Sequence, residues 1–338
     1  YKSMPYQIWN RRYTGSKYKL SNWISGLIHD NCVGNSFCDL FAGTAIMSKK
    51  MIDSIDEIYI NDFLYSNEII YKAFFEQSDY DLKKLEFLKN AFIETPLSQI
   101  SENYVSKNFG NKFFSYNDSL RIGYIREKIE NDKTLNEKEK NILIASLLYS
   151  LDKAANTVGH YDAYIKGKQI NDTFTFELIE PYVFKNKKIH ISRLDANELA
   201  KSISCDIVYI DPPYNSRQYS RFYHILENIA KWKKPELFGT ACKPKAENMS
   251  EYCRSSATRT FEELISSLNC KYIVVSYNNT YNSKSSSSKN KIALEDIKHI
   301  LENKGTVSIF EKEHQYFNAG KTELPNHKEL VFITKVGG

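Results

Sequence analysis

The chain lacks several features that would have pointed to other classes of protein. No apolar run approaches the roughly 18 residues that a membrane-spanning helix needs. The polar, basic segment at residues 1–19 has no apolar stretch typical of a secretion signal. None of the six cysteines forms a C-x-x-C pair, which argues against zinc and is typical of reduced thiols in a cytosolic protein. The dinucleotide fingerprint G-x-G-x-x-G is also absent, which disfavours a nicotinamide oxidoreductase. We therefore expect a cytoplasmic protein without a membrane segment or a metal.

Length and composition indicate a globular protein. The 338 residues suffice for one large domain or two ordinary ones, and 42% of them are hydrophobic. The net charge is +5 and the isoelectric point is about 8.6. This modestly basic balance is compatible with a nucleic-acid partner.

The most informative stretch is Asp211-Pro212-Pro213-Tyr214. It follows the apolar run 205–210, which predicts a buried parallel strand. The two prolines fix φ and lack N–H donors, so the backbone can neither continue a ladder nor enter a helix at once. The turn therefore presents a carboxylate, free carbonyl oxygens and an aromatic ring where open α/β sheets bind ligands. This set suits a planar amino group, which needs two acceptors and a ring to stack on.

A second signal lies upstream. Residues 36–45 predict a short strand that ends in a turn of small residues, followed by a helix at about 45–52. Small residues let the backbone approach a ligand, and the start of the helix offers N–H groups. A further strand, 57–60, ends at Asn61-Asp62. An acid at the end of the second strand can bind ribose hydroxyls.

The remaining pattern predicts an interrupted α/β sheet. The following elements are expected: a helix at 141–155, irregular structure at 156–183, strands at 189–191, 205–210 and 270–276, helices at 219–232 and 261–268, a mobile loop at 280–289, and a closing antiparallel pair at 306–310 and 329–334. The region between 80 and 150 is helical and charged. The segment between the two halves of the sheet is too long to be a loop, so we predict an inserted domain. The expected domains are 1–75 with 187–338, and an insertion at 76–186.

The order of these motifs resembles the alpha group of S-adenosylmethionine-dependent DNA adenine-N6 methyltransferases, the class of Dam and many restriction-modification enzymes. The resemblance implies a Rossmann-like class I methyltransferase sheet with an inserted, largely helical target-recognition region. It also implies double-stranded DNA as substrate, a flipped-out adenine, and a cognate restriction endonuclease as a candidate partner. The residues that match the catalytic tetrad are Asp211, Pro212, Pro213 and Tyr214. The residues that match the cofactor site are Tyr13, Gly15, Lys17, Asp39, Phe41, Ala42, Gly43, Asp62 and Asp195. After Gly43 the turn departs from the commoner form of the group, since Thr44 and Ala45 stand where further glycines are usual.

Several side chains are candidates for contact with DNA. The segment 156–164 carries polar and aromatic groups that can reach base edges or phosphates, and two arginines follow the tetrad at helical spacing. The candidates are Asn156, His160, Tyr161, Arg217 and Arg221. A structural histidine and a solvated helix face are the alternatives for His160 and for the arginines. Likewise, Asp62 and Asp195 could be helix caps, Lys17 could be a solvated cation, and Asp211 could be a strand-end cap.

Three functions remain open at this point. The first is site-specific adenine-N6 methylation of DNA, which the sequence favours because four motifs occur in family order. The second is methylation of an RNA base, such as one in ribosomal RNA, because related tetrads occur in such enzymes. The third is a non-catalytic DNA-binding subunit that kept the fold.

Overall fold

The computed structural model describes residues 5–13, 17–213, 223–245, 251–253, 256–279, 292–314 and 327–337. The chain divides into two compact units. The sheet unit comprises Lys17–Phe63, Asn186–Tyr219 and Asn248–Gly338, and the helical unit comprises Tyr1–Ser16, Leu64–Lys185 and Ser220–Glu247. Tyr214, Gly15, Arg217, Arg221 and the expected loop at 280–289 lie outside the described residues. Within the described part, no helix is both long and apolar enough to cross a membrane.

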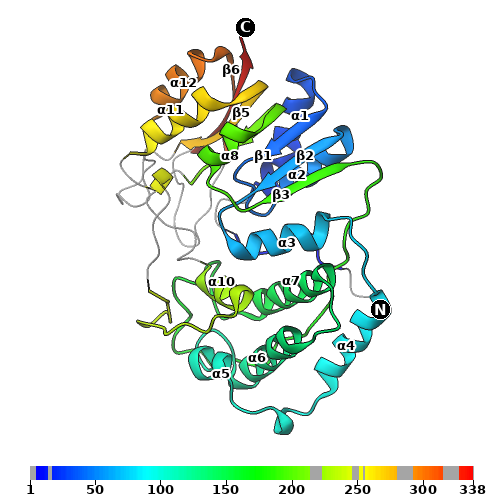
Figure 1. The fold of residues 1–338 in the computed structure, drawn as a ribbon. Helices are drawn as coiled ribbons and strands as arrows, with labels where there is room; N and C mark the ends of the chain where they lie inside the picture. Colours follow the sequence, from blue (N-terminus) through cyan, green and yellow to red (C-terminus); the bar gives the residue numbers. More distant parts are fainter. Residues whose placement is uncertain are drawn as a thin grey trace. The chain divides into compact units, whose positions relative to one another are not determined.

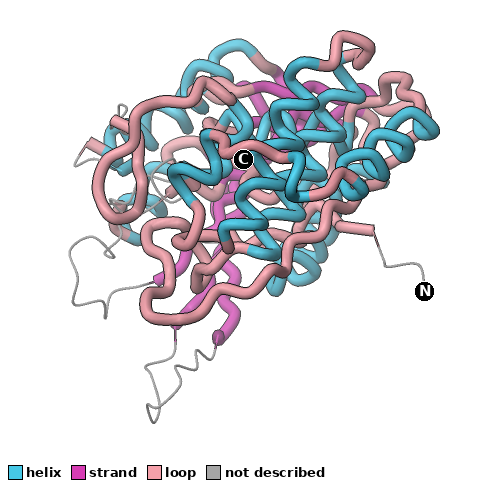
Figure 2. Tube along the Cα trace, turned by 90° about the horizontal axis from the view of Figure 1, so that it is seen from below, coloured by secondary structure: helices cyan, strands magenta, loops and turns pink. Residues whose placement is uncertain are grey.

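A mixed sheet forms the centre of the sheet unit (Figure 1; magenta in Figure 2). Its strands are β1 (Ser36–Asp39), β2 (Glu57–Asn61), β3 (Lys188–Ser192), β4 (Ser204–Ile210), β5 (Asn269–Asn279), β6 (Gly305–His314) and β7 (His327–Val336). Their order is β3-β2-β1-β4-β5-β7-β6. The first five strands pair in parallel, whereas β7 is antiparallel to both β5 and β6. This is the Rossmann-like sheet of class I methyltransferases, as the sequence predicted, including the antiparallel closing pair.

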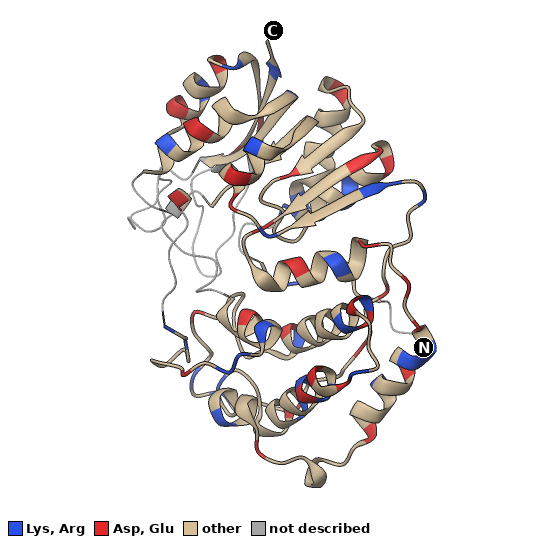
Figure 3. Cartoon of the chain, in the orientation of Figure 1, with Lys and Arg blue, Asp and Glu red and all other residues tan. Residues whose placement is uncertain are grey.

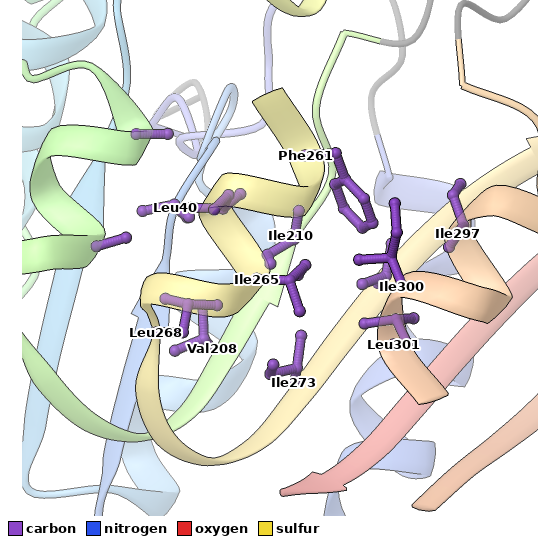
Figure 4. Packing of buried hydrophobic residues seen from close by; sticks show 14 of the residues in the cluster. Leu40, Val208, Ile210, Phe261, Ile265, Leu268, Ile273, Ile297, Ile300 and Leu301 are labelled. Atoms are coloured by element: carbon purple, nitrogen blue, oxygen red, sulfur yellow. The ribbon is translucent and has the colours of Figure 1, made fainter. Parts of the chain in front are cut away.

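One face of this sheet is covered by three helices, α8 (Ala196–Ser202), α11 (Ala257–Ser267) and α12 (Leu294–Glu302). Figure 4 shows Phe261 and Ile265 of α11 and Ile300 of α12 packed over Val208 and Ile273 of the sheet. Because side chains alternate along a strand, the intervening residues point to the opposite face. That face has its own helices, α1 (Ser21–Asn31) and α2 (Ile46–Met51), which pack on each other. Burial on both faces explains why β4 is a nearly continuous apolar run.

The helical unit packs around α7. Its helices are α3 (Tyr65–Phe75), α4 (Leu82–Glu94), α5 (Tyr104–Phe109), α6 (Tyr116–Asn131), α7 (Glu137–Ala154) and α10 (His224–Lys231). Most of α7 is buried, and α3, α6 and α10 all contact it. Charges of both signs are interspersed along α6 and α7 (Figure 3). The predicted helix at 141–155 corresponds to the later part of α7, which begins at a capping box in which Asn136 and Glu139 satisfy each other's backbone N–H groups and ends at Ala154.

The segment after α7 has no regular structure, as expected from its sequence. It runs back along the helices because their side chains accept its backbone N–H groups. Ser146 accepts from Ile179, and Asp118 accepts from Thr173 and Phe174. Side-chain acceptors thus replace the ladder that the segment lacks.

The boundaries of the two units differ in three places from the domains expected from sequence. Helix α3, which the sequence places in the first half of the sheet domain, belongs to the helical unit, as do residues 1–16 and 220–247. Hydrogen bonds as well as apolar contacts hold these segments in the helical unit. The Glu227 carboxylate of α10 accepts hydrogen bonds from the backbone N–H groups of Tyr65 and Ser66, at the start of α3. Two segments far apart in sequence are therefore joined through the orphan donors of one helix.

Candidate functional site

Three carboxylates lie at the carboxyl edge of the sheet unit. Asp39 is the last residue of β1, Asp62 follows the last residue of β2, and Asp211 follows the last residue of β4. These strands are parallel neighbours in the order β2-β1-β4. Parallel strands bring their carboxyl ends to the same edge, so acids from distant parts of the chain meet there.

The turn after β1 is held against the end of β2. The Ala42 N–H donates to the Asn61 carbonyl oxygen at 2.8 Å, and the Gly43 N–H donates to Asp62 Oδ2 at 2.9 Å. Gly43 has a φ of 56°, a left-handed conformation that glycine adopts without strain. Ala45, with a φ of 62°, adopts the same region at the start of α2. The backbone therefore turns sharply, as the small residues predicted, even without further glycines.

Asp39 is buried, with 1% of its surface exposed. Its Oδ2 accepts hydrogen bonds from Ser48 N at 3.2 Å and Ser48 Oγ at 2.6 Å, whereas its Oδ1 is buried without a hydrogen-bond partner. Burial raises the pKa of Asp39 to about 7; the Ser48 hydrogen bonds oppose this, and the charges of Asp211 and Asp62 add to it. A desolvated acceptor of this kind favours a nearby positive charge.

Asp211 is paired with Lys17, whose Nζ lies 3.5 Å from Asp211 Oδ2. Burial raises the pKa of Asp211 to about 6, Lys17 opposes that rise, and the charge of Glu329 adds to it. Pro212 and Pro213 continue the chain beyond β4 without regular structure. The structure thus brings two of the sequence-predicted residues, Lys17 and Asp211, into direct contact, although they were assigned to different parts of the site.

Asn61 is a site residue that the sequence reasoning missed. Its Nδ2 donates to the carbonyl oxygens of Leu40 and Leu194, and its Oδ1 accepts from Leu194 N and Ser192 Oγ. One buried amide therefore ties together the ends of β1, β2 and β3. The only signal in the sequence is its position beside Asp62, which does not show these partners.

Phe41 follows β1 and Asp195 follows β3, the two strands that flank β2 at this edge. Asp195 is exposed, and its Oδ1 accepts from Asn197 N and Glu198 N as the N-cap of α8. Phe41 meets the ring of Tyr252 edge-on, with ring centroids 5.1 Å apart. Tyr252 in turn donates to Asn197 Oδ1 at 2.7 Å. The cap fixes the position of Asp195, so capping and ligand binding are compatible roles for it.

The remaining predicted residues belong to the helical unit. Tyr13 stacks on Tyr223 with ring centroids 4.9 Å apart. Tyr161 has no exposed surface and donates to Asp152 Oδ1 at 2.8 Å. The Nδ2 of the buried Asn156 donates to the carbonyl oxygens of Lys112 and Ile165.

This geometry corrects the expectation that Tyr161 and Asn156 contact DNA directly. A fully buried ring cannot reach a base edge, and the Asn156 amide already holds two loop segments together. His160, by contrast, is partly exposed, and its Nδ1 accepts the N–H of Asp162. The buried polar groups of Asn156 and Tyr161 organise a loop rather than bind a ligand.

Comparison with known proteins identifies the family. Residues 13–316 match the model of the D12 class N6 adenine-specific DNA methyltransferases. The chain is 32% identical to the type II methyltransferase M.NlaIII of Neisseria lactamica, over 94% of this chain and 95% of that protein. It is 28% identical to M.CviAII of Paramecium bursaria Chlorella virus 1, covering 95% and 97% of the two chains. It is also 30% identical to M.FokI of Planomicrobium okeanokoites, where it covers 95% of this chain and about half, 52%, of the relative.

Proposed function

We propose roles for individual residues in this chain, which belongs to the D12 class of N6 adenine-specific DNA methyltransferases. The enzyme transfers a methyl group from S-adenosylmethionine to the N6 amino group of adenine at specific sites in DNA, as the methyltransferase of a restriction-modification system. This assignment favours DNA over the RNA alternative and catalysis over a purely binding role.

The three carboxylates at one sheet edge are the observation that supports this location for the cofactor. S-adenosylmethionine supplies a methyl group on a positively charged sulfur. The carboxylates of Asp39, Asp62 and Asp211 place negative charge at this edge. One buried oxygen of Asp39 has no hydrogen-bond partner. The chemistry of this set therefore fits a cationic ligand. The residues that would hold it are Lys17, Asp39, Phe41, Ala42, Gly43, Asp62 and Asp195, together with Tyr13 and Gly15 as the family resemblance implies.

Asp211 is the group that we propose acts on the target base. The N6 nitrogen of adenine is a weak nucleophile because its lone pair is delocalised into the ring. When the Asp211 carboxylate and the Pro212 carbonyl accept its two hydrogens, the nitrogen becomes pyramidal and its lone pair is available. These fixed acceptors also stabilise the positive charge that develops on the nitrogen. Pro213 keeps the turn rigid, and Tyr214 would stack on the adenine after it leaves the helix.

The test is Asp211→Asn, which keeps the shape of the side chain and removes its charge. We expect the rate of methyl transfer to DNA to fall by about 10²-fold or more, while cofactor affinity changes only a few-fold. Transfer from labelled cofactor to unmethylated duplex DNA measures the rate, and mass spectrometry of the nucleosides identifies N6-methyladenine. Calorimetric titration measures cofactor binding.

Asp206→Asn is the matched control. Asp206 lies on the same strand, where it accepts a hydrogen bond from Asn35 N at 2.8 Å and pairs with Lys271 at 3.5 Å. Its loss affects local structure but no predicted site residue, so its transfer rate should stay near that of the wild type. Wild-type turnover by Asp211→Asn would exclude the proposed role of the carboxylate.

The helical unit is the part that we propose recognises the target sequence. Support comes from its exposed basic turn, where Lys166 and Lys168 flank Gly167, and from the partly exposed His160 earlier in the same irregular segment. Arg217 and Arg221 stay candidates for phosphate contacts. A cognate restriction endonuclease and a cytoplasmic location follow from the restriction-modification role, and both remain predictions.

A further inference from the structure

Asp152 is a buried carboxylate of the helical unit that neither the motifs nor the proposed mechanism uses. It lies near the end of α7 and has 3% of its surface exposed. Its Oδ2 accepts a hydrogen bond from the backbone N–H of Arg12 at 3.0 Å, and its Oδ1 accepts from the Tyr161 hydroxyl at 2.8 Å. One satisfied buried carboxylate therefore joins the chain at Arg12 to the irregular segment that follows α7.

The side chain of Arg12 joins the same two segments a second time. Its Nη1 donates to the carbonyl oxygens of Ala155 at 3.0 Å and of Thr157 at 2.9 Å. It also donates to Thr157 Oγ1 at 3.2 Å, and this hydroxyl oxygen accepts the N–H of Gly159 at 3.4 Å. A segment without a helix or a strand depends on such side-chain donors for a defined conformation.

Tyr13, the next residue in the chain, is held in place by three aromatic and polar contacts. Its ring stacks on that of Tyr223, with centroids 4.9 Å apart and 3° between the ring planes. The Arg11 guanidinium lies over the same ring, 5.3 Å from its centroid. Asn67 accepts from Arg11 Nη1 at 2.8 Å and donates to the Tyr13 hydroxyl at 3.4 Å. The Tyr13 ring and the segment after α7 are therefore both fixed to one short stretch of chain.

These contacts place two proposed binding elements in one network. Tyr13 begins the cofactor segment that the family resemblance implies, and the segment 156–164 carries the partly exposed His160, a candidate for contact with DNA. A binding element that is already held in place loses less conformational freedom when its ligand arrives, so its affinity is higher. If the network opened, each ligand would have to re-form it, and its apparent affinity would fall in proportion to the fraction of molecules with an intact network.

We propose that Arg12 is a positioning residue, which together with Asp152 preorganises the cofactor segment at Tyr13 and the segment 156–164 as one network. This inference rests on the proposed roles of Tyr13 in cofactor binding and of the helical unit in DNA recognition. The network itself is a property of the free enzyme and can be measured without either ligand.

The first measurement is amide hydrogen exchange of the free enzyme, followed by mass spectrometry of its peptides. Arg12→Met keeps an unbranched side chain and removes the donor to Ala155 and Thr157. We expect exchange in the segment 156–164 to become roughly tenfold faster. Arg12→Lys should restore part of the protection, because its ammonium still offers donors to these oxygens. Unchanged exchange in Arg12→Met would overturn the proposal whether or not the enzyme methylates DNA.

Arg121→Met is the matched control for this substitution. Arg121 belongs to the same unit and is partly buried like Arg12, and its Nη1 also donates to two backbone carbonyl oxygens, those of Phe92 and Thr95. Its loss should destabilise the helical unit without a change in exchange at 156–164. The affinities for cofactor and DNA should also stay near those of the wild type.

The second measurement compares the affinities for two ligands, each alone and with the other at saturation. The ligands are the demethylated cofactor, which cannot react, and a labelled duplex that the wild-type enzyme methylates. Arg12→Met should weaken the binding of each ligand alone roughly tenfold. Once one ligand has re-formed the network, the affinity for the other should be near that of the wild type. The two ligands should therefore bind about tenfold more cooperatively to the variant than to the wild type, and the single-turnover rate at saturation should change less than about threefold.

The pattern of affinities separates a positioning role from a merely structural one. Unchanged affinities, or weaker binding of one ligand only, would show that Arg12 does not serve both elements. Weaker binding of both ligands with the cooperativity of the wild type would indicate independent structural damage, and it would also contradict the proposal. Failure of the wild type to methylate DNA would instead contradict the proposed function, while hydrogen exchange would still decide whether the network exists.

Discussion

At the scale of single residues, the pKa of Asp39 predicts how the affinity for the cofactor depends on pH. Its pKa of about 7 means that the free enzyme loses a negative charge as the pH falls through neutrality. A cationic ligand binds the ionised form better, so affinity should rise as the pH rises toward 7 and then level off. Below pH 7 the dependence can reach about tenfold per pH unit. Calorimetric titration between pH 5.5 and 8.5 measures it.

The chemical origin of this effect can be isolated with variants and a second ligand. Asp39→Asn should weaken binding and flatten the part of the pH dependence that comes from this carboxyl. The demethylated product, whose sulfur is neutral, should depend less on Asp39 than the cofactor does. Asp53→Asn, an exposed acid of the same unit, is the control. An unchanged pH profile in Asp39→Asn would remove Asp39 from the cofactor site.

At the scale of elements, α3 is fixed at both ends by charged side chains from other helices. Glu227 accepts from the backbone at its start, and the buried Lys138 Nζ donates to the carbonyl oxygens of Lys72, Ala73 and Glu76 at its end. These charges match the helix dipole and satisfy groups that the helix leaves unpaired.

Lys138→Met should therefore destabilise the helical unit more than its apolar volume suggests. Methionine fills the space but removes the ammonium donor from three carbonyl oxygens, of which the Lys72 oxygen still accepts from Glu76 N, at a cost of about 2–3 kcal/mol. Lys140→Met is the matched control, because Lys140 makes a partly exposed ion pair with Glu130 at 3.2 Å. That pair should contribute less than about 1 kcal/mol. Urea unfolding of both variants measures the difference, and equal losses would show that the capping of α3 is not responsible.

At the scale of the whole molecule, DNA affinity should depend on the exposed basic turn at Lys166 and Lys168. Removing two phosphate contacts reduces the slope of log affinity against log salt by about two. We expect that change in the double variant Lys166→Ala/Lys168→Ala, measured by titration of duplex DNA at several salt concentrations. Lys83→Ala/Lys133→Ala removes the same charge from other exposed positions of the helical unit. A slope equal to that of this control would show that Lys166 and Lys168 do not contact the DNA phosphates.

Local signals in the sequence were enough to predict several elements of the fold. The apolar runs at 205–210 and 270–276 predicted strands β4 and β5, and the paired prolines after Asp211 predicted that β4 does not continue beyond them. The order of four short motifs indicated the family, which the comparison then confirmed. Such signals survive in one chain because strand burial, turn geometry and helix periodicity depend on neighbouring residues.

Tertiary structure decided which distant residues meet. It assigned α3 to the helical unit, buried Tyr161 against Asp152, and paired Lys17 with Asp211. None of these outcomes has a local signal, because each depends on strand order, register or helix packing across long separations in sequence. Burial then fixes the charge states of the site, since desolvation and nearby charges, rather than residue type, set the pKa values of Asp39 and Asp211.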